Sequence, residues 1–196
     1  MESQLAFLAV CLASAASPGP GGLAVVSNSI NHNLRRTLPV IFGIATGLML
    51  ASLLANTWLL AVIHSSEMAF QVMTWLCSGY IAYLGCKALY YAKSEITIAA
   101  QGYGFKNGVL ISLLNPKTLV FFGALFPMFI PSNEHFAAYA VMLTIELVAI
   151  TLIIHVLISS AIDKVSHLLK HHIVLINRIT GLLFIGLGIS GFMLQK

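Results

Sequence analysis

Long apolar stretches, separated by short polar connections, run along the whole chain. Each is about 20 residues or longer, which is the length that an α-helix needs to cross the hydrocarbon core of a bilayer. The pattern predicts six spans: Leu5–Val26, Leu38–Ile63, Met68–Tyr91, Val109–Ile130, Phe136–Ile162 and Ile173–Leu194. We therefore expect an all-α polytopic membrane protein, in which residues 1–196 form a single transporter domain of six transmembrane helices.

Composition agrees with this class. Hydrophobic residues make up 59% of the 196 residues and charged residues only 8%, against about 25% charged residues in soluble domains. The net charge of +4 does not indicate nucleic-acid binding, because the basic residues flank apolar spans. Glu2 and the lack of Lys or Arg before the first apolar run argue for a retained first span rather than a cleaved signal.

The basic residues predict an orientation. Eight of the ten Lys and Arg residues would lie on one side of a six-span arrangement. They are Arg35, Arg36, Lys87, Lys93, Lys106, Lys164, Lys170 and Arg178. The positive-inside rule assigns this side to the cytoplasm, so both termini are expected outside.

Prolines interrupt one apolar run in each half of the chain. The first lies in Ser17-Pro18-Gly19-Pro20 and the second in Asn115-Pro116-Lys117. A proline inside a helix removes a backbone hydrogen bond, and in lipid the freed groups need partners in protein or in a water-filled cavity. Paired breaks in corresponding spans indicate the binding site of a secondary transporter. We assign both motifs to a substrate or proton pathway, which suits a zwitterion such as an amino acid.

The two halves also share their order of spans. In each half a proline-broken span precedes an uninterrupted span and a third span that contains glycines, which predicts two inverted three-helix repeats, about 1–93 and about 104–196. Small residues let helices approach closely. The expected packing positions are Gly43, Gly47, Gly85, Gly181 and Gly186. The Gly43-x-x-x-Gly47 motif also serves as a dimer face, so a homodimer stays open.

Ionisable residues inside the spans suggest a second element of the pathway. Lys117 and Glu146 reach similar depth near the membrane midplane on consecutive spans. They form either a static ion pair or a site where Glu146 accepts a proton, and intramembrane charges favour function. His155 is a secondary proton-relay candidate, although its helix face differs from that of Glu146, which favours a packing histidine.

The sequence gives little support for enzymatic, nucleotide-driven or metal-dependent chemistry. The sequence contains no nucleotide-binding loop and no Ser–His or HExxH arrangement. We therefore expect no enzyme, no cofactor and no metal site, and read His167, His171 and His172 as part of a lipid-facing basic turn. A carrier of another small zwitterion or cation, or a membrane-embedded enzyme or accessory subunit, remains the alternative.

These motifs together resemble the lysine-exporter superfamily, especially its homoserine/threonine-exporter (LysE/RhtB) branch, over the whole chain. The resemblance rests on the two proline motifs, Gly43 with Gly47, Tyr83-Leu84-Gly85, and Arg178 with Gly181. It implies a bacterial inner-membrane exporter of amino acids or close derivatives, driven by proton antiport. The chain departs from the family at Pro127-Met128-Phe129, where Pro-Gln-Phe is common, and we expect the loss of that amide to alter contacts with the substrate.

Overall fold

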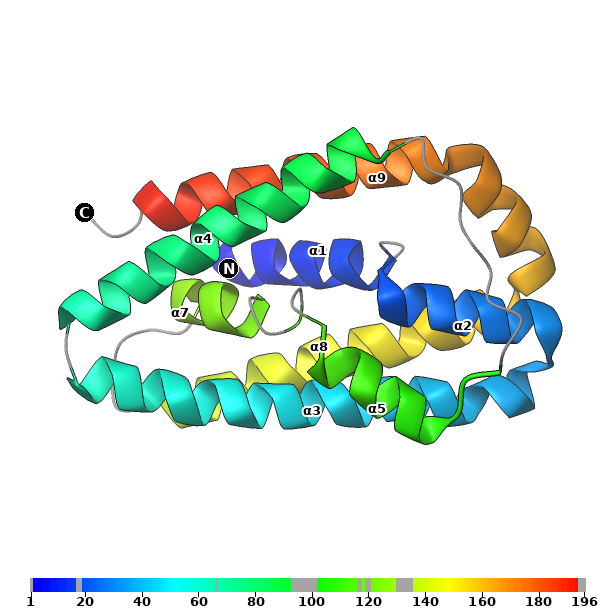
Figure 1. The fold of residues 1–196 in the computed structure, drawn as a ribbon, viewed down its shortest axis with the longest axis horizontal. Coiled ribbons are helices and arrows are strands. Elements are labelled where there is room, and N and C mark those ends of the chain that lie inside the picture. Colours follow the sequence, from blue (N-terminus) through cyan, green and yellow to red (C-terminus); the bar gives the residue numbers. More distant parts are fainter. Residues whose placement is uncertain are drawn as a thin grey trace.

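The computed structural model describes residues 2–16, 19–65, 67–92, 102–115, 118, 121–129 and 136–193. Over these ranges every regular element is a helix, which confirms the all-α class. The elements are α1 (Glu2–Ala16), α2 (Pro20–Asn31), α3 (Leu34–Ser65), α4 (Glu67–Tyr90), α5 (Phe105–Leu113), the π-helical turn η1 (Phe121–Leu125), α7 (Phe126–Phe129), α8 (Phe136–Ser160) and α9 (Ile162–Met193). Figure 1 shows them as an elongated bundle whose helices follow the long axis.

Three parts of the described chain have the length and composition of membrane spans. Leu34–Thr57 within α3 and Phe136–Ser160 in α8 are continuous candidates. The pair formed by α1 and α2 passes the same test as one span bent by 49°. α1 ends at Ala16 and α2 begins at Pro20, so helical structure is interrupted at the Ser-Pro-Gly-Pro motif, as predicted. The count of six spans stays a prediction.

Two predicted spans differ from the helices. Residues 163–172 were expected to connect two spans, but α9 is continuous from Ile162. No proline or glycine interrupts this segment, so nothing in it ends a helix. The fourth predicted span, Val109–Ile130, is divided: α5 ends at Leu113, and helical structure resumes in η1 and α7.

The helices pack as two groups around α1. α4 packs against α9, and α3 packs against α5 and α8. Figure 1 shows α1 between these two groups, and α1 also contacts α8. The rings of Phe7, Phe122 and Phe126 meet edge to face, with centroid distances of 6.4 Å for Phe7–Phe126 and 4.8 Å for Phe122–Phe126. This aromatic contact holds η1 and α7 against α1.

Glycines bring the backbones of α3 and α5 together. A Cβ added at Gly43 would fall on the carbonyl oxygen of Phe105, and one at Gly47 would lie 2.6 Å from the Cβ of Ser112. Such close approach needs glycine. The small-residue face of α3 is therefore occupied by α5 of the same chain.

The contact between α4 and α9 uses a different glycine from the one predicted. A Cβ at Gly85 would lie 2.6 Å from the carbonyl oxygen of Gly181, as expected for a close approach. Gly186 is exposed, and a Cβ there would meet nothing within 4 Å. Gly188 approaches the carbonyl oxygen of Ser78 instead, at 2.7 Å from its added Cβ. Seven residues make about two helical turns, so Gly188 shares a face with Gly181 and Gly186 does not.

Exposed basic residues lie at the starts of two helices. Arg35 and Arg36 belong to the first turn of α3, and Lys106 to the first turn of α5. Figure 1 shows both helix starts toward the same end of the bundle as the junction of α8 with α9. The junction of α3 with α4 and the end of α9 lie at the opposite end. The bundle therefore has a basic end among its described residues.

Candidate functional site

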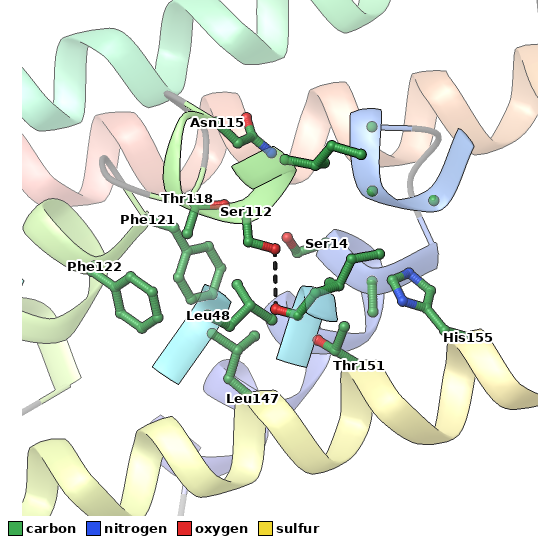
Figure 2. A pocket seen from close by; sticks show the side chains of 16 residues that line it. Ser14, Leu48, Ser112, Asn115, Thr118, Phe121, Phe122, Leu147, Thr151 and His155 are labelled. Carbon is green, nitrogen blue, oxygen red and sulfur yellow. Dashed lines mark hydrogen bonds between the residues drawn. The ribbon is translucent and has the colours of Figure 1, made fainter. Parts of the chain in front are cut away.

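A cavity of about 70 Å³ lies inside the bundle, with walls from α1, α2, α3, α5, η1 and α8. Because one water needs roughly 10–15 Å³, the cavity has room for several waters or for a small solute. Its polar lining residues are Ser14, Ser112, Asn115, Thr118, Thr151 and His155. Leu48, Phe121, Phe122 and Leu147 supply an apolar part of the wall, as Figure 2 shows. The cavity therefore offers both hydrogen bonds and apolar contact.

The first helix break presents a helix N-terminus to the cavity. α2 begins at Pro20, and its N-cap residue, Gly19, has extended backbone angles and no capping side chain. Gly19, Gly21 and Gly22 line the cavity, whereas the side chain of Pro20 is exposed. The first N–H groups of a helix lack partners within the helix and carry partial positive charge. Those of Gly21 and Gly22 are therefore suited to an anionic group.

The second break borders the same cavity. α5 ends at Leu113, and the N–H group of Leu114 donates to the carbonyl oxygen of Leu110 at 2.9 Å. Asn115 and Thr118 then line the cavity, and the N–H group of Thr118 donates to the carbonyl oxygen of Asn115 at 2.9 Å. Both proline motifs thus contribute a lining residue, Gly19 from one and Asn115 from the other.

A hydrogen bond fixes α5 beside this break. The hydroxyl of Ser112 donates to the carbonyl oxygen of Ile44 on α3 at 3.0 Å, drawn as the dashed line in Figure 2. This bond lies where Gly47 lets α3 and α5 approach. The wall on this side is consequently held by backbone contact and by a buried hydroxyl.

One face of α8 closes the cavity from the other side. Leu147, Thr151 and His155 line it at four-residue intervals, the spacing of one helix face. His155 is only 3% exposed, and its Nδ1 atom has no hydrogen-bond partner within the part of the chain that the structure describes. The sequence offers a packing role or a proton relay for this histidine, and both stay predictions. The structure places it in the cavity wall.

Glu146 lies on another face of α8 and does not line the cavity. The side-chain amide Nε2 of Gln4 donates to both of its carboxylate oxygens, at 2.7 Å and 3.0 Å. Lys117 lies outside the described residues, so its predicted pairing with Glu146 stays a prediction. Ser17, Pro18 and Pro116 also lie outside the described residues.

Polar side chains continue from the cavity toward the basic end of the bundle. Ser159, one turn beyond His155 on α8, accepts a hydrogen bond at 2.8 Å from the hydroxyl of Ser29 on α2. Next to Ser29, the side-chain amide of Asn28 donates to the carbonyl oxygen of Tyr103 at 2.7 Å, and its Oδ1 accepts from the Tyr103 N–H at 2.6 Å. These bonds join α2 to α8 and to the segment before α5.

The sequence did not indicate any of the four hydroxyl residues that line the cavity. Ser14, Ser112, Thr118 and Thr151 were not singled out, because hydroxyl residues are common in apolar helices, where they bond to the carbonyl four residues earlier. Thr46 does so on α3, with no part in the cavity. The spacing along the chain could have indicated two polar positions. Thr151 and Ser159 each lie four residues from His155, and so share one helix face with it.

The arrangement suits non-covalent binding. Over the described residues, no group of three or more His, Cys, Asp or Glu residues could hold a metal ion. The wall instead combines helix N–H donors with an amide, hydroxyls and an imidazole. These groups can bind a small solute that carries both a negative and a positive group.

Comparison with known proteins identifies relatives across nearly the whole chain. The model of the LysE type translocator family matches residues 12–195, which include both helix breaks. The homoserine/homoserine lactone efflux protein of Salmonella typhimurium is 32% identical over 147 residues, covering 72% of this chain and 71% of that protein. An uncharacterised membrane protein of Vibrio cholerae is 31% identical over 144 residues, covering 70% of each.

A more distant relative covers the chain almost completely. It is an uncharacterised membrane protein of Bacillus subtilis, 26% identical over 207 residues, which are 97% of this chain and 98% of that protein. No solved structure gives a significant match. From the extent of the family match and the identity to the Salmonella protein, the chain belongs to the LysE type translocator family.

Proposed function

We propose that this protein is a secondary-active exporter of amino acids or close derivatives, which works by proton antiport across the bacterial inner membrane. The family supports transport, and relatives named for efflux of homoserine and homoserine lactone support an amino-acid-type substrate. The strongest structural support is that one cavity is lined by residues from both helix breaks.

The cavity would bind the substrate by its charged ends. The carboxylate lies at the N-terminus of α2, where the N–H groups of Gly21 and Gly22 donate to it. The ammonium group lies toward Asn115, Thr118 and His155, which offer oxygen and nitrogen acceptors. The small apolar wall leaves room for a short side chain. A lactone keeps the ammonium group and presents a carbonyl oxygen to the same N–H donors.

The proposal includes six spans in two inverted repeats. The first half of the chain has a broken span followed by α3 and α4. The second half has a broken span followed by α8 and α9, in the same order. Figure 1 shows α1–α2 and α5–α7 running in opposite directions along the bundle, in agreement with this plan. Transport then consists of one repeat rocking against the other around the cavity.

The proposed orientation in the membrane follows from the positions of the basic residues. The end that carries Arg35, Arg36 and Lys106 faces the cytoplasm, and both chain termini lie outside. Ser17, Pro18, Pro116 and Lys117 remain proposed members of the pathway because of the motifs they form. Glu146 remains a proposed proton acceptor, one that Gln4 already holds by two hydrogen bonds.

An efflux assay tests the proposal. Cells that express the protein are preloaded with radiolabelled L-homoserine, and we expect faster efflux and better growth on toxic homoserine than in empty-vector cells. Gly21→Leu, which places a large side chain in the cavity wall, should abolish the gain. Gly186→Leu is the matched control, since an added Cβ there meets nothing within 4 Å, and it should keep the gain.

Two outcomes contradict this function. Equal efflux from expressing and empty-vector cells, over a panel of amino acids and their lactones, would exclude an amino-acid exporter. Conversion of the labelled compound to a new product without flux across the membrane would favour the membrane-embedded enzyme.

A further inference from the structure

His155 is the one titratable side chain among the described residues that line the cavity. It is 3% exposed, and its buried Nδ1 atom has no hydrogen-bond partner among the described residues. A buried polar atom without a partner costs free energy and is rare in folded proteins. Nδ1 has almost no accessible surface, so a solute in the cavity with an N–H donor would satisfy this atom once the ring turns toward it.

Among the described residues, no other titratable or charged group shares this wall. The elements packed against α8 are α1, α2, α3 and α9. The described groups of these kinds on them, at their ends or on α8 itself are Cys11, His32, Arg35, Arg36, Tyr139, Glu146, His172 and Arg178. None of them lines the cavity. Among the described residues, His155 is therefore the group through which protonation would change the charge of the cavity wall.

We propose that His155 is the exchange point of this antiporter, a nitrogen that holds either a proton or the ammonium group of the substrate. This inference rests on the proposed export function. In the neutral ring, the Nδ1 lone pair accepts a hydrogen bond from the substrate ammonium group. When a proton from outside binds that lone pair, the imidazolium repels the ammonium group and the substrate leaves. The proton leaves toward the cytoplasm when the next substrate binds.

The hydroxyls beyond His155 support a route for that proton. Ser159 is 4% exposed, lies one turn further on the same face of α8, and accepts a hydrogen bond from Ser29 at 2.8 Å. Hydroxyls both donate and accept, so this pair can continue a hydrogen-bond chain toward the basic end. Glu146 has no such position, because it lies off the cavity and is bonded to Gln4.

The test measures protons released when substrate binds. L-homoserine is added to purified protein in weakly buffered detergent solution between about pH 3 and pH 8, so that the imidazole is charged at the acid end of the range and neutral at the other end. If the proton and the substrate ammonium group compete for one nitrogen, each weakens binding of the other by the same factor. Binding of one homoserine should therefore release up to about one proton. His155→Gln and His155→Asn, which retain an acceptor but do not titrate, should bind homoserine and release at least about tenfold fewer protons.

One control and one competing-site variant complete the test. His32→Gln removes a histidine at the end of α2 that does not line the cavity, and it should release protons like the wild type. Glu146→Gln removes the other proposed proton acceptor, so proton release that persists in this variant assigns the exchange to His155. Undiminished proton release by both His155 variants would overturn the inference, as would loss of release in Glu146→Gln alone.

The proposed function and this inference fail in distinguishable ways. If the wild-type protein neither binds nor exports homoserine or related amines, the export function fails and the inference with it. If the wild type exports homoserine but both His155 variants lose homoserine binding, only the inference fails, since the imidazole then serves binding and not exchange.

Discussion

At the scale of single residues, hydrogen-bond partners distinguish two side chains of α8. Sequence favours Glu146 as the functional group because an intramembrane carboxylate is costly. In the structure the amide of Gln4, far away in the sequence, donates to both oxygens of this carboxylate. The Nδ1 atom of His155 is buried and has no partner among the described residues. These partners come from other helices, so the periodicity of the sequence does not predict them.

The contact between Gln4 and Glu146 predicts a stability effect. Gln4→Leu leaves the part-buried carboxylate without its amide donor, so the free energy of unfolding should fall by about 1–3 kcal/mol. The double variant Gln4→Leu/Glu146→Leu removes both polar groups and should recover most of that loss. Thermal unfolding in detergent measures both. A double variant less stable than Gln4→Leu would show that the amide is not the main partner of Glu146.

A cavity hydroxyl predicts an effect on transport. Thr151→Val keeps the side-chain volume and removes one hydrogen-bonding group from the cavity wall. Loss of a hydrogen bond worth about 1 kcal/mol should raise the KM for homoserine efflux roughly fivefold. Thr46→Val, which removes a hydroxyl bonded to the carbonyl of Phe42 outside the cavity, is the matched control. Equal KM values in the two variants would remove Thr151 from the site.

At the scale of elements, helix breaks and glycines shape the molecule. The proline motifs predict breaks in two spans, and α1–α2 and α5–η1 are separate helices at those places. The glycine pattern alone does not show which glycines lie in helix contacts. Both Gly186 and Gly188 occur in α9, but only Gly188 is seven residues from Gly181 and faces α4 with it. The face of the helix on which a glycine lies, and not the presence of glycine alone, decides whether it packs against another helix.

These glycines predict opposite outcomes for the same substitution. Gly181→Ala adds a Cβ that would lie 2.8 Å from the carbonyl oxygen of Gly85 and from Cγ of Leu89. Such overpacking should lower the free energy of unfolding by about 1–3 kcal/mol. Gly186→Ala should leave it unchanged or raise it slightly, because the added methyl meets nothing within 4 Å and alanine favours helix. Thermal unfolding of the two variants side by side measures the difference.

At the scale of the whole molecule, the positions of the basic residues and the directions of the broken segments both agree with the proposed arrangement. Basic helix starts gather at one end of the bundle, and the broken segments of the two halves run in opposite directions. The proposed repeats have an odd number of spans each, which requires this inversion. Residues from both halves of the chain line the cavity, the position that the proposed alternating access needs.

The proposed orientation predicts the behaviour of reporter fusions. Alkaline phosphatase, which is active only outside the cytoplasm, should be active when fused after Lys196 and inactive when fused after Lys106. A cytoplasmic fluorescent protein should show the reverse pattern. Fluorescence after Lys196 would place the C-terminus inside and would reverse the orientation or change the number of spans.

The sequence by itself determined the class of the protein, its helical character and the places where helices break. Apolar length, charge content and proline position are local properties, and in lipid an apolar run of about 20 residues satisfies its own backbone hydrogen bonds as a helix. Tertiary structure decided which polar groups meet: that Gly19 and Asn115 share a cavity, that Thr151 and His155 face it, and that Glu146 faces Gln4. These contacts depend on helix rotation and on neighbours distant in the chain, which a linear pattern does not contain.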